Sequence, residues 1–104
     1  MSRQYHKLVR DRIPQIIEST GKTCRTEVLD DETYLRFLDK KLEEELAEYQ
    51  DSKSLEELAD LLEVMEAVVA ARDYTWEQLQ EIKAEKKAAR GGFAEKILLL
   101  EVSE

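Results

Sequence analysis

Hydrophobic residues recur at three- and four-residue intervals along most of the chain, which is the periodicity of amphipathic helices. Asp30 and Asp31 offer an N-cap at the start of the clearest example. The pattern predicts a helix from there to about residue 49. Its single apolar stripe consists of Leu35, Leu38, Leu42, Leu46 and Tyr49.

Capping patterns predict two further long helices. Ser54-x-x-Glu57 has the form of a capping box, and a helix is expected from there to about residue 72. Another is expected after Thr75-x-x-Gln78, ending at residue 90 where two glycines follow. Only a short turn at residues 51–53 separates the first two long helices, which therefore form a hairpin.

The segments outside these three helices are shorter or less regular. Residues 1–11 form a basic arm, and Pro14 suits the first turn of a short helix that stops at Gly21. Residues 22–29 are expected to be extended or irregular. Residues 93–104 form an apolar C-terminal tail, either docked on the helices or pairing as a strand.

The helix expected over residues 54–72 is apolar around more than half of its circumference. Such a helix is buried on more than one side, and three other helices in a small chain cannot easily surround it. We therefore predict an all-α fold of about four helices, a single domain over residues 1–104, whose bundle is completed by homo-oligomerisation, most simply as a dimer. The apolar residues are Leu55, Leu58, Leu61, Leu62, Val64, Met65, Val68 and Val69.

Composition narrows the function classes. The 104 residues carry a net charge of −8, which argues against nucleic acids and anionic membranes as partners. No apolar run is long enough for a transmembrane segment. Cys24 is the only cysteine and His6 the only histidine, which favours a reduced cytoplasmic setting and excludes Cys/His zinc sites and His-dependent triads.

The charge is segregated along the chain. Residues 27–66 contain fifteen acidic and four basic residues, a net charge of −11. Residues 1–12 and 83–90 each carry a net charge of +3, from four basic residues and one acidic residue. Any function assigned to the chain should therefore explain why an acidic centre lies between two basic segments.

Four carboxylates are expected to face each other inside the hairpin. Glu45 and Glu48 lie three residues apart on its first helix, and Glu57 and Asp60 lie three apart on its second. Glu48 and Glu57 are equally far from the turn, and so are Glu45 and Asp60. Unpaired buried carboxylates are costly, so protons or cations must compensate, and an all-oxygen site suits Mg²⁺ or Mn²⁺.

Simpler interpretations stand beside this one. Glu57 could serve only as a capping residue, and Glu44 or Glu48 could be solvated surface residues, as Glu43, Glu56 and Glu63 are expected to be. A ferritin-like di-iron site needs Glu-x-x-His motifs, which the helices lack.

Several motifs together resemble the MazG-like all-α nucleoside triphosphate pyrophosphohydrolases, a superfamily that includes the phosphoribosyl-ATP pyrophosphohydrolases. Glu44-Glu45-Leu-Ala-Glu48 followed by Glu57-Leu-Ala-Asp60 is similar to their acidic signature. The flanking sequences that look like a small-protein branch of the group are Lys7-Leu-Val-Arg-Asp-Arg-Ile-Pro14, Lys41-Leu-x-Glu-Glu and Arg90-Gly-Gly-Phe93. The interval of eight residues between Glu48 and Glu57 is shorter than in many members.

The resemblance implies Mg²⁺-dependent cleavage of a nucleoside triphosphate, or of phosphoribosyl-ATP, between the α- and β-phosphates. It implies that metal ions are held by Glu45, Glu48, Glu57 and Asp60. Glu44 would support these ligands or orient the attacking water, so the catalytic set is Glu44, Glu45 and Glu48. Substrate phosphates would be bound by the basic residues Lys7, Arg10, Arg12, Lys41, Lys83, Lys86 and Arg90.

Some alternatives stay open. The cations could simply form a solvated face, in part because the C-terminus of a helix favours positive charge. Trp76 and Tyr74 could stack on a base, or Trp76 could anchor the core; His6 could touch phosphate or do nothing. The rival function is a non-catalytic acidic helical dimer that acts as a protein-interaction module.

Overall fold

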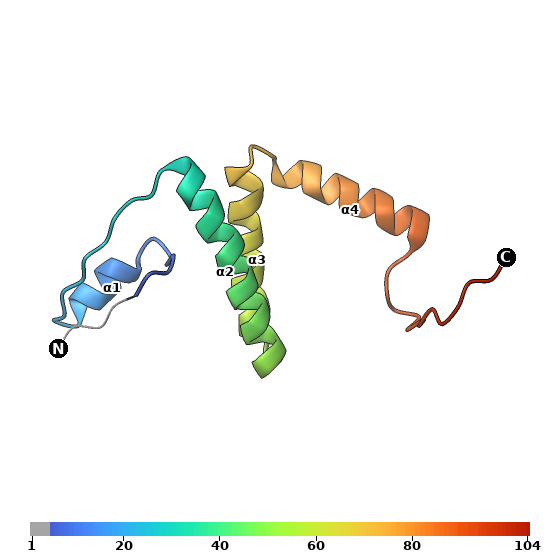
Figure 1. Cartoon of the computed structure of the whole chain (residues 1–104), viewed down its shortest axis with the longest axis horizontal. Helices are drawn as coiled ribbons and strands as arrows, with labels where there is room; N and C mark the ends of the chain where they lie inside the picture. The colour runs from blue at the N-terminus through green and yellow to red at the C-terminus, as the bar shows by residue number, and fades with distance from the viewer. Residues whose placement is uncertain (1–4) are drawn as a thin grey trace.

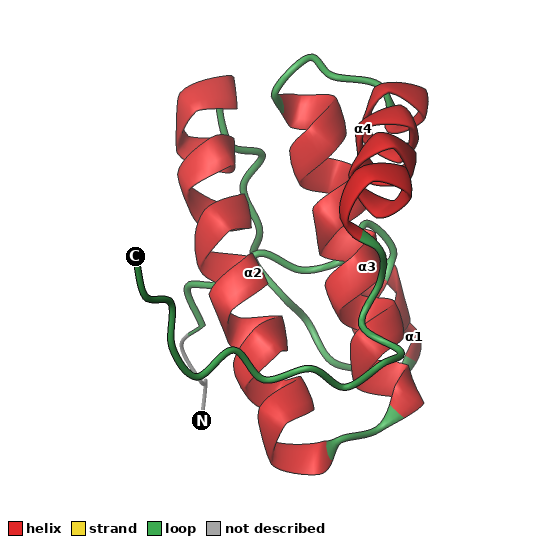
Figure 2. Cartoon of the chain, turned by 90° about the vertical axis from the view of Figure 1, so that its right-hand side faces the viewer, coloured by secondary structure: helices red, strands yellow, loops and turns green. Residues whose placement is uncertain are grey.

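The computed structural model describes residues 5–104 and contains four helices in a row, with no strand among those residues (Figures 1 and 2). The predicted all-α class is thereby confirmed. Residues 1–4 of the predicted basic arm lie outside the described residues. The helices are α1 (Ile13–Ser19), α2 (Asp31–Ser52), α3 (Leu55–Ala71) and α4 (Trp76–Arg90).

Local capping signals set most helix boundaries. The Asp30 carboxylate accepts a hydrogen bond from the Thr33 backbone N–H at 2.8 Å, which fixes the start of α2 and lowers the pKa of Asp30. Lys53 ends α2 in the left-handed conformation, with φ 59°. Gly91 ends α4 with φ 81° and ψ 178°, an extended backbone at positive φ that glycine adopts readily.

The two capping boxes predicted from the sequence behave differently. At α4, Thr75 and Gln78 bond each other's backbone N–H groups reciprocally, at 2.8 and 3.1 Å. At α3, the Ser54 hydroxyl accepts from the Glu57 backbone N–H, but the Ser54 backbone N–H donates to the Ser52 hydroxyl instead of to Glu57. The Glu57 carboxylate is therefore not used for capping.

The packed part of the molecule is the antiparallel hairpin of α2 and α3, which lie side by side in both views (Figures 1 and 2). Leu38 is 2% exposed and is the only buried hydrophobic residue among those described. At the open end of the hairpin, the Arg72 guanidinium donates to the Asp39 carboxylate at 3.0 Å. Among the described residues, the hairpin is thus held by one small core and by one exposed ion pair at its open end.

The remaining elements do not close a bundle around this hairpin. Helix α4 contacts α3 only and then runs away from it, and α1 packs on no other helix (Figure 1). The radius of gyration is 18.6 Å, against about 13 Å for a compact domain of this length. Four helices are present as predicted, but within one chain they form an open arrangement.

The predicted C-terminal tail is neither docked nor a strand. Residues 93–104 are irregular and exposed, and they follow α4 at the end far from the hairpin (Figure 1). Residues 22–29 connect α1 to α2 without helix or strand, as expected from their sequence. No helix among the described residues is long and apolar enough to cross a membrane.

Candidate metal centre

Three carboxylates from the two helices of the hairpin converge. Glu45 of α2 and Glu57 and Asp60 of α3 each offer one oxygen, and these three oxygens lie within 4.8 Å of one another. Glu45 lies two turns after Leu38, on the same face of α2. It therefore enters the hairpin interior and is only 6% exposed. The hairpin register predicted for these acids from the sequence agrees with this convergence.

The cluster leaves carboxylate oxygens without partners. Oε2 of Glu45 and Oε2 of Glu57 are both buried and accept no hydrogen bond. A buried carboxylate oxygen without a donor is unfavourable. Protons or a cation could compensate these oxygens, and an all-carboxylate set has the chemistry that Mg²⁺ and Mn²⁺ prefer.

Electrostatics in the cluster disfavours the charged carboxylates. Burial raises the pKa of Glu45; a hydrogen bond from Lys41 opposes the rise, and the negative charges of Glu48 and Asp60 add to it. Burial also raises the pKa of Glu57, and Glu48, Asp60 and Glu45 raise it further. Four acids thus act on one another, so a bound cation would be stabilised by all of them.

Glu48 is the member of the predicted set that stays at the rim. Its side chain is exposed, and it is not one of the three residues whose oxygens converge. Glu57, which lies equally far from the turn on α3, is half-buried and has one buried carboxylate oxygen. Its charge nonetheless raises the pKa of both Glu45 and Glu57, so it belongs to the same electrostatic unit.

Two basic side chains already approach the acids. Lys41, one turn before Glu45 on α2, places Nζ 3.3 Å from its carboxylate and 3.7 Å from that of Glu44. Arg10, from the segment before α1, donates to Oδ1 of Asp60 at 2.7 Å. The basic arm therefore reaches the acidic hairpin across fifty residues of sequence.

The other predicted substrate-binding cations are not brought to the cluster. Lys83, Lys86 and Arg90 lie on α4, which extends away from the hairpin, and all three are exposed (Figure 1). Lys7 lies with Nζ 5.6 Å from the centre of the Tyr5 ring, and Arg12 lines a shallow hollow beside α1. Among the cations that the structure describes, only Arg10 and Lys41 join the acids of their own chain.

Glu43, Glu56 and Glu63, which were expected to face outward, are all exposed.

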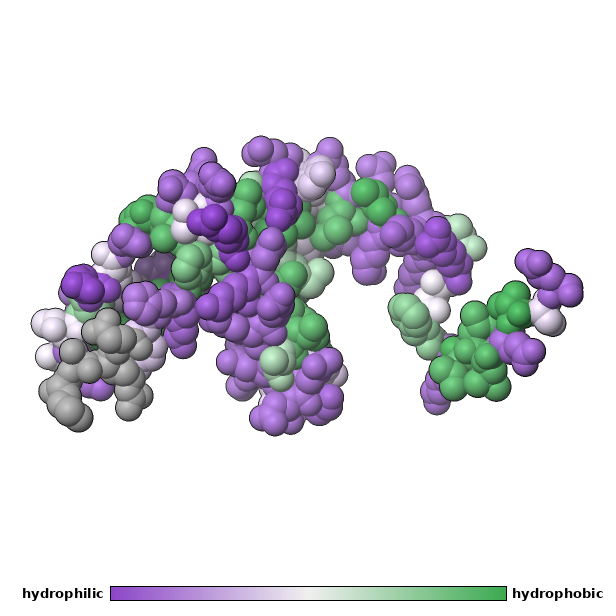
Figure 3. All heavy atoms as spheres, viewed as in Figure 1, coloured by the Kyte–Doolittle hydropathy of each residue, from purple (hydrophilic) through white to green (hydrophobic). Residues whose placement is uncertain are grey.

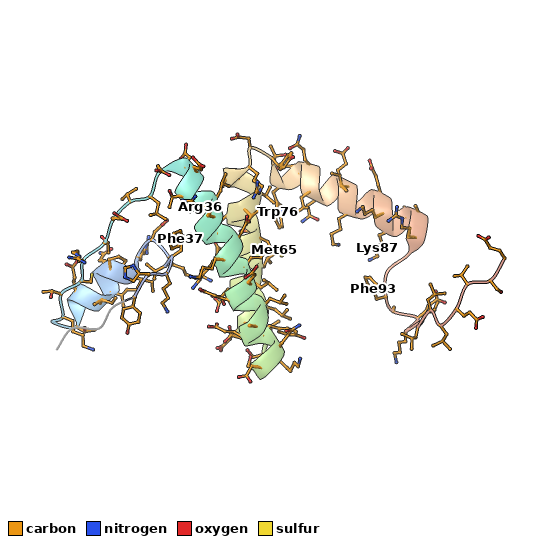
Figure 4. All side chains as sticks on the ribbon, viewed as in Figure 1. Arg36, Phe37, Met65, Trp76, Lys87 and Phe93 are labelled. Atoms are coloured by element: carbon orange, nitrogen blue, oxygen red, sulfur yellow. The ribbon has the colours of Figure 1, made fainter. Side chains whose placement is uncertain are left out.

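Trp76 is half-buried where α3 meets α4, as Figure 4 shows, and it lines a small hollow with Val69 and Ala70. Trp76 therefore joins the two helices and does not lie beside the carboxylates, where it could stack on a base. Sequence reasoning missed the pairing of Arg10 with Asp60, because no local signal links an arm residue to a particular acid.

Comparisons with known proteins give one partial match. An uncharacterised protein of Mycolicibacterium smegmatis is 50% identical over 42 residues, which is 40% of this chain and 43% of that protein. The chain thus spans less than half the length of this curated relative. No family model matches the chain, and no solved structure matches it.

Proposed function

We propose that this chain is a Mg²⁺-dependent nucleotide pyrophosphohydrolase of the MazG-like kind, which hydrolyses a nucleoside triphosphate or phosphoribosyl-ATP to the monophosphate and pyrophosphate. The observation that carries the proposal is the convergence of Glu45, Glu57 and Asp60 with two buried, unpartnered carboxylate oxygens. The motifs that resemble this superfamily support it, and they include the three residues that converge.

In this proposal the metal is held by Glu45, Glu57 and Asp60, with Glu48 contributing from the rim. When bound, Mg²⁺ lowers the pKa of a coordinated water and neutralises charge on the phosphates and the leaving pyrophosphate. Mn²⁺ offers the same ligand preferences. Glu44, beside Lys41 on the same helix, is assigned to orienting the attacking water.

The cations of the chain supply the remaining charge. Arg10 already lies at the acidic cluster, and its guanidinium can exchange the Asp60 carboxylate for a phosphate group once a metal engages that carboxylate. Lys41 offsets the charge of Glu45 in the same way. Lys7 and Arg12 flank Arg10 in sequence and are assigned to the outer phosphate oxygens. A role for Lys83, Lys86 and Arg90 requires a second copy of the chain, because α4 holds them away from its own hairpin.

Pyrophosphate release tests the proposal. The full chain should release pyrophosphate from at least one member of a panel of nucleoside triphosphates and phosphoribosyl-ATP when Mg²⁺ is present, and should stop when EDTA is added. The same panel separates nucleotide-pool cleaning from a role in histidine biosynthesis. Folded protein that turns over no member of the panel contradicts the proposal.

Variants of the acids assign their roles. Glu48→Gln and Asp60→Asn should each lower kcat by about 10²–10³-fold, since each removes a carboxylate that would hold the metal ion, and the ion would stabilise the developing negative charge. Glu43→Gln, an exposed acid of the same helix, is the matched control and should leave activity unchanged. Full activity in both Glu48→Gln and Asp60→Asn contradicts the assignment of metal ligands.

The second candidate is a non-catalytic acidic helical dimer that binds a protein partner. The ion pairs of Arg10 with Asp60 and of Lys41 with Glu45 favour it, because they show acids compensated by the protein's own cations. Titration calorimetry with Mg²⁺ or Mn²⁺, with and without a non-hydrolysable triphosphate, separates the two functions. The enzyme should bind the metal, and more tightly with the nucleotide, whereas the interaction module should bind neither.

We further propose a homo-oligomer, a cytoplasmic location and no nucleic acid or membrane as partner. The exposed face of α3 supports the homo-oligomer. The single cysteine, Cys24, which is free, supports the cytoplasmic location, and the net charge of −8 supports the absence of nucleic acid and membrane partners.

A further inference from the structure

Two apolar surfaces of this chain lack a partner. The first, called here the α3 stripe, consists of four side chains at helical spacing, Leu55, Leu58, Leu62 and Met65, which are 39–80% exposed. They lie roughly 100° around the helix from Leu61, Val64 and Val68, which are half-buried against α2. The hairpin therefore uses one side of α3 and leaves the adjacent side uncovered.

The second surface is the C-terminal segment. Its large apolar side chains are 76–98% exposed and stand out as a hydrophobic cluster separated from the hairpin (Figure 3). Figure 4 shows Phe93 just beyond α4, at the end far from α3. The segment, called here the apolar tail, spans residues 93–102 and contains Phe93, Ile97, Leu98, Leu99, Leu100 and Val102.

The chain exposes far more surface than a compact monomer of its mass does. Its accessible surface is 9939 Å², whereas a compact monomer of this mass exposes about 6,000 Å². The difference of about 4,000 Å² per chain, by the same scaling, is ample for the roughly 1,000–2,500 Å² that each subunit of an obligate dimer buries.

The tail is long enough to cover the stripe of another copy. Ten extended residues span about 33 Å, which exceeds the roughly 15 Å that the stripe covers along α3 between Leu55 and Met65. Helix α4 separates the two surfaces as a rod of 15 residues, about 22 Å long. The closed capping box at Thr75 holds the start of this rod, which carries the tail away from its own hairpin.

We propose that the apolar tail of one copy docks on the α3 stripe of a second copy, and that the second copy returns the same contact. The partner is thus another molecule of this chain, and the exchange is symmetric, as in most homodimers. This proposal is independent of the hydrolase proposal, because it needs neither the metal nor a substrate.

Sedimentation of the full chain in EDTA tests the docking. The wild-type chain should sediment at twice its own mass. Ile97→Asp/Leu99→Asp places two charges in the tail and should weaken dimerisation at least tenfold. Lys96→Asp lies in the same tail and changes the net charge by the same two units, so it should dimerise like the wild type. A monomeric wild type, or equal dimerisation by all three chains, overturns the proposal.

Disulfide trapping distinguishes exchange between copies from docking within one chain. In a Cys24→Ser background, a Leu62→Cys chain mixed with a Leu98→Cys chain should form a mixed disulfide dimer. Replacing Leu62→Cys by Glu43→Cys, on the exposed face of α2, should reduce that product at least tenfold. When both cysteines are in one chain, an intrachain disulfide in a monomer overturns the proposal, whereas linked dimers support it. Pyrophosphate release by the same chains is measured in parallel, so that failure of the docking proposal and failure of the hydrolase proposal can be told apart.

Discussion

The hairpin and the C-terminal region reverse the usual arrangement of a globular protein. The interior between α2 and α3 contains carboxylates, with Glu45 nearly as buried as Leu38. The region after α4 exposes six large apolar side chains to water. Burying a charge is costly unless a proton or a cation compensates it, and a large exposed apolar cluster is typical of an interaction surface. In the two proposals made above, the first region would hold a metal ion and the second would contact another copy of the chain.

The largest effect is expected where the hairpin depends on its small core. Leu38→Ala should destabilise the chain by about 2–5 kcal/mol, because a buried leucine loses its contacts and leaves a cavity. Leu46→Ala, on the same helix but 45% exposed, should cost clearly less. Urea unfolding followed by circular dichroism measures both. Equal losses would show that the core of the hairpin lies elsewhere.

A smaller effect is expected from the charges in the hairpin interior. Burial raises the pKa of Glu45 and Glu57, so their contribution to stability is fully present below their ordinary value of 4.5 and is lost as pH rises through the raised pKa. Without metal, the melting temperature should therefore fall across this window. Added Mg²⁺ should raise it near neutral pH and have little effect in acid.

One variant isolates this effect. Glu57→Gln should raise the melting temperature of the metal-free chain near neutral pH and remove most of the response to Mg²⁺. Glu56→Gln, the exposed neighbour, should change neither. Differential scanning fluorimetry with EDTA or Mg²⁺ reads out both variants. A Glu57→Gln chain that still gains stability from Mg²⁺ would place the ion at other residues.

The smallest effect compares the two helix starts. Ser54→Ala and Thr75→Ala each remove one capping hydrogen bond, at a cost of about 1 kcal/mol. Because α4 contacts only α3, loss of its cap should speed hydrogen exchange of α4 amides alone. Loss of the α3 cap should lower the stability of the whole hairpin. Global destabilisation by Thr75→Ala would mean that α4 is more tightly integrated than its contacts indicate.

The sequence by itself determined the helices and the starts of the three long ones, whereas α2 continues to Ser52, about three residues past its expected end. Capping residues such as Asp30 and Thr75 act on backbone groups two or three residues away, so their effect is local and can be read from the pattern. The register of Glu45 with Asp60 was predictable for the same reason, since a short turn leaves few ways to align two antiparallel helices.

Only the tertiary structure decided which acids are buried and which cations reach them. Glu48 is exposed, whereas Glu57, equally far from the turn, keeps a buried carboxylate oxygen. The Ser52 hydroxyl accepts the capping hydrogen bond that Glu57 could have accepted. Arg10 reaches Asp60, while the cations of α4 lie on a helix that runs away from the hairpin. These outcomes depend on packing between segments distant in sequence, where small differences in helix length and direction decide the contacts, and no local signal encodes them.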